Sequence, residues 1–119
     1  KHFKMTNAKN VVELGCGDGN QLSYFTGYKK YTGYDISVNI IKKCNLKFIN
    51  DSTKIFTSDI TEVNDKKYDV ALSLDVIYHL VEDDVYKKYL DTLFTISDIV
   101  IIFGVDNENE VLIFYSKYY

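Results

Sequence analysis

The sequence predicts an α/β fold, a three-layer sandwich in which helices cover both faces of a mainly parallel, doubly wound sheet. Short, continuously apolar runs alternate with longer stretches of helical periodicity, a pattern typical of strands buried on both faces. Glycines and acidic residues follow several of these runs, at the edge where such sheets bind ligands. Counting strands along the chain, we expect the sheet order 3-2-1-4-5, with one extra C-terminal strand as a further candidate.

Composition and charge limit the class of protein. The 119 residues are 46% hydrophobic and 26% charged, which predicts one globular domain over residues 1–119. Because the chain begins with lysine, we also consider that it is a fragment of a longer chain. The net charge of -3 and the absence of arginine disfavour a nucleic-acid partner. No apolar run reaches the length of a membrane span and no signal-peptide pattern is present, so we expect a cytoplasmic protein without membrane contact.

Five strands are expected, each from an apolar or β-branched run bounded by polar or turn residues. In chain order they span Asn10–Leu14, Tyr31–Asp35, Lys54–Ser58, Tyr68–Leu74 and Ile99–Phe103. A sixth candidate, Val111–Tyr115, would form a hairpin with the fifth strand across the acidic turn at residues 106–110.

Three helices are expected between these strands. A helix from about Asn20 to Tyr28 would place Leu22 and Phe25 on one face. Ser37 is a candidate N-cap for the second helix. The inward-facing residues of that helix would be Val38, Ile41 and Cys44. A third, amphipathic helix is expected over Asp83–Ile96, with apolar residues at helical spacing.

A glycine-rich loop follows the first strand. In Glu13-Leu14-Gly15-Cys16-Gly17-Asp18-Gly19, three glycines alternate directly before a predicted helix. Glycine permits positive φ and close approach of a ligand to the backbone, and a helix start offers free N–H groups. A dinucleotide fingerprint would need a sixth-position glycine, where this chain has Asn20. The alternative without function is an ordinary strand-to-helix turn.

The acidic-x-G-x-G-x-G pattern resembles the first motif of the class I, Rossmann-like S-adenosylmethionine-dependent methyltransferases. The resemblance covers roughly residues 9–104. It implies S-adenosylmethionine as the cofactor and S-adenosylhomocysteine as the product. It also implies a truncated methyltransferase fold, because full members usually carry seven strands and we find no candidate for a seventh.

The resemblance assigns the cofactor site. Asp35 would accept hydrogen bonds from both ribose hydroxyls, chemistry that suits a carboxylate at a strand end. Asp59 would contact the adenine amino group, and Glu13 would orient the loop or meet the cofactor's amino group. For Asp35 and Asp59 the alternative is a helix-terminal or capping carboxylate. The full set of expected cofactor-binding residues is Glu13, Gly15, Cys16, Gly17, Gly19, Asp35, Ile36, Asp59, Ile60 and Leu74.

The segment after the fourth strand resembles the family's fourth motif, which passes between cofactor and methyl acceptor. Asp75, Tyr78 and His79 are therefore the candidates for the catalytic, acceptor-facing side. His79 could act as a base near neutral pH. Many methyltransferases use no base, because placing the acceptor in line with a strong electrophile suffices. The cysteines and histidines show no metal-ligand spacing, so no metal is expected.

Three functions follow from these observations. The first is methyl transfer to an unidentified acceptor, for which we prefer a small molecule because the chain is acidic and lacks arginine. The second is a module that binds S-adenosylmethionine without independent catalysis. The third is a nucleotide-binding domain of an oxidoreductase, which Asn20 argues against. A homo-oligomer or a partner chain could complete the acceptor site.

Overall fold

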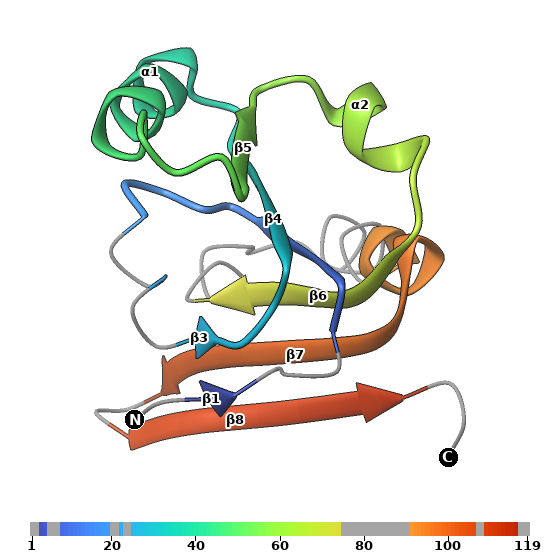
Figure 1. The fold of residues 1–119 in the computed structure, drawn as a ribbon. Helices are drawn as coiled ribbons and strands as arrows, with labels where there is room; N and C mark the ends of the chain where they lie inside the picture. Colours follow the sequence, from blue (N-terminus) through green and yellow to red (C-terminus); the bar gives the residue numbers. More distant parts are fainter. Residues whose placement is uncertain are drawn as a thin grey trace.

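The computed structural model describes residues 3, 4, 8–19, 22, 25–74, 91–106 and 109–116. Six strands form one sheet in the order β5-β4-β2-β6-β7-β8 (Figure 1). In that order they are Lys54–Thr57, Lys30–Tyr34, Asn10–Leu14, Tyr68–Leu74, Ser97–Asp106 and Asn109–Ser116. The first five pair in parallel, and β8 pairs antiparallel with β7. The predicted order is confirmed, and so is the extra strand as a hairpin.

Helices cover both faces of the sheet, so the three-layer arrangement is confirmed. Helix α1 (Val38–Lys47) buries Ile41 and Cys44 in a cluster that includes Val11 of β2. Helix α2 (Ile60–Asn64) and the helical residues 91–96 contribute to a second cluster. Alternate residues of β2 belong to the two clusters, because successive side chains of a strand point to opposite faces. This double burial explains why Val11, Val12 and Leu14 of β2 are all apolar, with Glu13 as the one buried polar residue of the strand.

The helix predicted over residues 20–28 is wrong in its second half. Phe25–Thr26 is a strand, β3, which pairs in parallel with β1 (Phe3–Lys4). The next residue, Gly27, has a φ of 91°, which a right-handed helix cannot contain. Leu22 and Phe25 are nevertheless both buried in the first core cluster. The apolar spacing therefore identified core residues correctly but not their secondary structure.

Smaller differences occur at element ends. Val38 was expected to face inward but is 55% exposed, because it is the first residue of α1 and lies before the turn that contacts the sheet. The predicted helix over residues 83–96 is confirmed for 91–96, and residues 83–90 lie outside the described part of the chain. Ser58 and Asp35 follow β5 and β4 and are not part of these strands.

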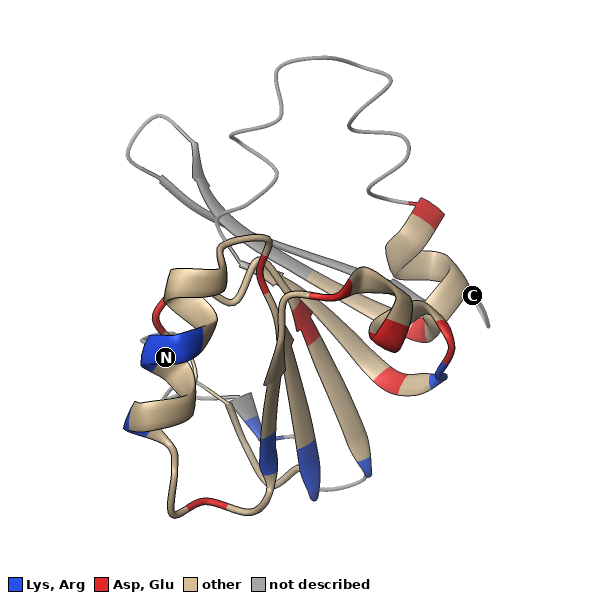
Figure 2. Ribbon diagram, turned by 90° about the horizontal axis from the view of Figure 1, so that it is seen from above, with Lys and Arg blue, Asp and Glu red and all other residues tan. Residues whose placement is uncertain are grey.

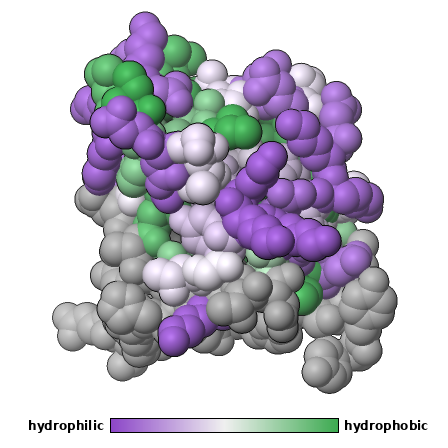
Figure 3. Space-filling view, in the orientation of Figure 1, coloured by the Kyte–Doolittle hydropathy of each residue, from purple (hydrophilic) through white to green (hydrophobic). Residues whose placement is uncertain are grey.

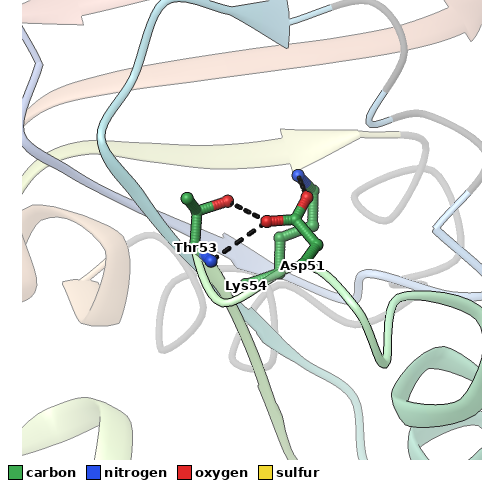
Figure 4. Close-up of polar contacts among 3 residues, drawn as sticks. All are labelled: Asp51, Thr53 and Lys54. Atoms are coloured by element: carbon green, nitrogen blue, oxygen red, sulfur yellow. Dashed lines mark hydrogen bonds and ion pairs between the residues drawn. The ribbon is translucent and has the colours of Figure 1, made fainter.

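A short polar turn connects α1 to β5 (Figure 4). The Asp51 carboxylate accepts hydrogen bonds from the backbone N–H and hydroxyl of Thr53 and forms an ion pair with Lys54. These bonds, the one from Lys54 foremost, lower the pKa of Asp51 to about 2. The Lys54 ammonium also lies 5.7 Å from the ring centroids of Tyr28 and Phe48. The turn thus fixes the start of β5 against the end of α1.

Candidate functional site

The glycine loop follows β2 and is hydrogen-bonded to the end of the neighbouring strand, β4. The backbone N–H groups of Gly15 and Cys16 donate to the Tyr34 carbonyl oxygen, at 2.8 and 2.9 Å. Gly15, Gly17 and Gly19 have φ values of 76°, 57° and 81°, which other residues rarely adopt. The alternating glycines thus let the chain fold back over the carboxyl ends of β2 and β4.

Asp35 connects this loop to the start of α1. Its Oδ2 accepts a hydrogen bond from the Gly17 N–H at 3.1 Å, and its Oδ1 accepts one from the Ser37 N–H at 3.0 Å. Each carboxylate oxygen has a second lone pair, so both can still accept a further bond. Asp35 is half-exposed. The carboxylate is therefore held in one orientation at a surface that a ligand can reach.

Gly17 and Gly19 differ in what surrounds them. A Cβ at Gly17 would have no atom within 4 Å. A Cβ at Gly19 would lie 2.8 Å from Phe48 Cε2. A side chain at position 19 would thus clash with Phe48, the C-cap residue of α1, whereas the backbone at Gly17 borders open space. A ligand can approach the loop backbone at Gly17.

Glu13 is the most unusual residue of the loop. It is 1% exposed, and its Oε1 accepts a hydrogen bond from the Tyr31 hydroxyl at 2.5 Å. Its Oε2 is buried and has no hydrogen-bond partner among the described residues. Burial raises the pKa of Glu13 from 4.5 to about 8, although the Tyr31 hydrogen bond lowers it. A cation near the loop would stabilise the ionised carboxylate.

Two buried cysteines lie at the loop, namely Cys16 within it and Cys44 on α1. The Cys44 thiol donates to the Gly17 carbonyl oxygen at 3.1 Å. Burial raises the pKa of the Cys16 thiol well above its usual range, so it is not a reactive thiolate near neutral pH. Sequence reasoning placed Cys44 only in the core; its inward position on α1 was predictable, but its hydrogen bond to the loop was not.

The ends of β4 and β5 bring further predicted residues together. Asp59 is the N-cap of α2, and its Oδ1 accepts hydrogen bonds from the N–H and hydroxyl of Thr61. These bonds lower the pKa of Asp59. Tyr34 was not predicted as a site residue, yet its pKa is raised by burial and by the charges of Asp35 and Asp59. Its position next to Asp35 in the sequence was the available signal.

Hydrophobic surface lies next to these carboxylates. Figure 3 shows apolar side chains reaching the surface over the α1 side of the molecule. Ile36 directly follows Asp35 and is 83% exposed, whereas Ile60 is half-buried against the second core cluster. Ile36 therefore offers apolar contact to a flat ligand at the loop.

Lysines gather at the amino ends of the strands (Figure 2), where Asp51 and Asp69 also lie. Lysines stand at or directly before the start of four strands, namely Lys9, Lys30, Lys54 and Lys67. Asp35 and Asp59 follow the carboxyl ends of β4 and β5. Two carboxylates therefore stand at the end of the sheet that carries the loop, where the Lys47 ammonium also donates to the Asp18 carbonyl oxygen.

The proposed acceptor side is not placed by the structure. Asp75, Tyr78 and His79 lie outside the described residues, and Leu74 is the last residue of β6. Within the described ranges, no group of three His, Cys, Asp or Glu side chains could hold a metal ion. No helix in the same ranges is long and apolar enough to cross a membrane.

Comparisons with known proteins identify the family of the chain. Residues 4–101 match a family described as a methyltransferase domain. The chain is 30% identical over 102 residues to a small RNA 2'-O-methyltransferase of Arabidopsis thaliana. The match covers 70% of this chain and 10% of that protein.

Solved structures show the same fold. The methyltransferase domain of bacterial CtHen1 is 25% identical with a TM-score of 0.68, and the match covers 86% of this chain and 60% of that one. An S-adenosylmethionine-dependent methyltransferase of Clostridium acetobutylicum is 21% identical with a TM-score of 0.70, and the match covers 85% and 45%. The chain thus spans less than two thirds of the length of these proteins.

Proposed function

This chain belongs to the class I S-adenosylmethionine-dependent methyltransferases, and we propose that it transfers a methyl group from S-adenosylmethionine to an acceptor, leaving S-adenosylhomocysteine. The observation that supports this most directly is the Asp35 carboxylate, which Gly17 and Ser37 orient beside the open space at Gly17. When bound, the cofactor supplies an electrophilic methyl group on a sulfonium.

The described residues fit the parts of this cofactor. The outward lone pairs of Asp35 suit two vicinal ribose hydroxyls. Ile36, which is exposed, suits one face of the adenine ring, with Ile60 near its edge. Asp59 keeps Oδ2 for the adenine amino group while Oδ1 caps α2. Glu13, with Oε2 unpaired, suits the cationic amino-acid end.

The acceptor side remains the segment after β6. We assign Asp75, Tyr78 and His79 to hold the acceptor in line with the methyl group, with His79 as the candidate base. Leu74 and Cys16 complete the expected lining of the cofactor site. A second copy or a partner chain could add acceptor contacts, which a measurement of the mass in solution would reveal.

A small molecule is the acceptor that the charge distribution favours. Two carboxylates stand at the strand ends that carry the site, and no arginine is available anywhere in the chain for phosphate contacts. A second candidate is an RNA ribose hydroxyl, because the relative from Arabidopsis thaliana is a small RNA 2'-O-methyltransferase. RNA binding requires a positively charged surface, whereas a small molecule does not, so the two acceptors can be separated by experiment.

A transfer assay with S-adenosylmethionine labelled on its methyl group tests the proposal. Wild-type protein is incubated with a panel of small hydroxyl- and amine-bearing compounds and, separately, with short RNA duplexes. We expect label in a small molecule, and much less label with Asp35→Ala when the cofactor concentration is limiting. Label in RNA would support the second candidate. Cofactor binding without any transfer would support a binding module, and nicotinamide cofactor binding would favour an oxidoreductase domain.

A further inference from the structure

Tyr31 and Glu13 form a hydrogen-bonded pair at the start of the glycine loop, and the cofactor assignment gives Tyr31 no role. Tyr31 is a residue of β4 and is 1% exposed. Its hydroxyl donates to Glu13 Oε1, while Glu13 Oε2 is buried without a partner among the described residues. A buried carboxyl oxygen without a partner is costly, so its presence next to a ligand loop needs a reason.

The position of the Tyr31 hydroxyl is fixed by packing. The ring of Tyr31 lies against Phe56 of β5, with centroids 5.8 Å apart, and against Tyr28, with centroids 6.0 Å apart. Such ring contacts leave little freedom for rotation in a close-packed core. The hydroxyl can therefore hold Glu13 Oε1 in place and leave Oε2 as the oxygen that carries the proton and that becomes an acceptor when the carboxyl ionises.

The groups that face Glu13 are themselves acids. They are Tyr31 and Asp35 from β4 and its end, and Cys16 from the loop, with Cys44 of α1 beyond Cys16. The residue paired with Glu13 on β6 is Leu72, which carries no charge. Burial of Glu13 foremost, and then the charge of Asp35, hold its pKa near 8 against the lowering effect of the Tyr31 hydrogen bond, so the carboxyl is mostly protonated at pH 7.

We propose that Tyr31 is a positioning residue for Glu13, and that binding of the cofactor's ammonium group at the loop releases the Glu13 proton. The inference rests on the proposed function. The neutral carboxyl loses one proton to the buffer and becomes the carboxylate that balances the bound cation. In a site of low dielectric constant the attraction acts even through one intervening water. The Tyr31 hydrogen bond lowers the cost of this ionisation, because it is stronger to a charged acceptor.

Calorimetric titration in two buffers of different ionisation enthalpy counts the protons released. The ligands are S-adenosylhomocysteine, which carries the ammonium, and 5'-methylthioadenosine, which shares the nucleoside but lacks it. At pH 7 we expect about one proton released with the first ligand and none with the second, and the release should decline as the pH rises above 8. Glu13→Gln should abolish the release.

Tyr31→Phe separates positioning from general structure. We expect about three- to tenfold weaker binding of S-adenosylhomocysteine at pH 7, the effect of about one hydrogen bond. Proton release should persist to higher pH than in wild type, a change that a purely structural loss would not produce. Tyr28→Phe is the matched control, because Tyr28 contacts the same ring, and it should behave as wild type. Thermal melts confirm that each variant is folded.

The outcomes distinguish this inference from the proposed function. Binding of S-adenosylhomocysteine by wild type without proton release between pH 6 and 8 would overturn the inference and leave the cofactor assignment standing. Proton release with 5'-methylthioadenosine would also overturn it. If wild type binds neither ligand, both the inference and the proposed function fail. If Tyr31→Phe does not fold, the comparison of wild type with Glu13→Gln still decides.

Discussion

Gly17 and Gly19 belong to one loop, yet they are glycines for different physical reasons. Both have positive φ, but only Gly19 is packed against Phe48, and Gly17 borders open space. The sequence motif predicted both as ligand-contacting residues without separating these roles. The distinction depends on the position of α1, which no local pattern contains.

Alanine at each position should show the difference. Gly17→Ala adds only backbone strain of about 1 to 2 kcal/mol, but its methyl group occupies the space that the cofactor would use. Gly19→Ala adds the same strain and a clash with Phe48, so it should be the less stable variant. Urea unfolding and titration with S-adenosylhomocysteine check this. Equal loss of stability in the two variants, with cofactor affinity retained in Gly17→Ala, would contradict it.

Glu13 should make the free energy of unfolding depend on pH. Its pKa is about 8 in the folded chain and near 4.5 when unfolded, so the unfolded chain ionises first as the pH rises. The stability that Glu13 contributes is complete below pH 4.5 and is lost as the pH rises toward 8, by about 1.4 kcal/mol for each unit of pKa difference.

Glu13→Gln should remove this dependence. Urea unfolding at pH 5 and pH 8 should show wild type losing more stability over the interval than the variant, because glutamine does not titrate. Glu62→Gln, at an exposed position of α2, is the matched control and should follow wild type. The same pH dependence in wild type and Glu13→Gln would mean that Glu13 is ionised in the folded protein.

At the scale of elements, the sequence predicted what periodicity can encode. Four of the five strands were expected within one residue of both ends, and Ser37 was correctly expected as the N-cap of α1. The fifth strand was expected over Ile99–Phe103, but β7 begins two residues earlier and ends three residues later. Helix α2 was missed because five residues are too few to show a period. The failure over residues 20–28 arose because Leu22 and Phe25 have α-helical spacing, but Leu22 has 3₁₀ geometry and Phe25 belongs to a strand.

The turn between α1 and β5 contains a pairing that sequence could not reveal. Asp51→Asn should lower the melting temperature at neutral pH, because the amide cannot replace the charge facing Lys54. The pKa of Asp51 is lowered, so its contribution is present above pH 3.8 and is lost as the pH falls toward 2. Thermal melts at pH 7 and pH 2 should show the difference disappear. A difference of equal size at both pH values would exclude the ion pair as its cause.

At the scale of the whole molecule, the sheet topology could be predicted because the strand pattern and the position of the glycine loop indicate the same fold. Continuous apolar strands implied a parallel sheet, and the glycine loop marked the strand at which the order reverses. The small β1–β3 pairing was not predictable, because two-residue strands give no pattern. The acceptor side depends on residues 75–90, so Asp75, Tyr78 and His79 stay predictions.

A buried and an exposed leucine make a testable contrast in stability. Leu93 is one of the helical residues 91–96 and is fully buried in the second core cluster. Leu46 on α1, by contrast, is 72% exposed. Leu93→Ala should cost about 2 to 5 kcal/mol, and Leu46→Ala should change stability by about 0.5 kcal/mol or less. Urea unfolding of both variants checks this. Similar small losses would mean that residues 91–96 do not pack on the sheet.

The central claim is that Asp35 and the glycine loop bind the cofactor, and calorimetric titration with S-adenosylhomocysteine tests it most directly. We expect micromolar binding by wild type, weakened by about 1 to 3 kcal/mol in Asp35→Ala through loss of charge-assisted hydrogen bonds. Asp65→Ala, which removes an exposed carboxylate beyond α2, should bind as wild type. Folded wild-type protein that does not bind, or equal affinity in wild type and Asp35→Ala, would contradict the account.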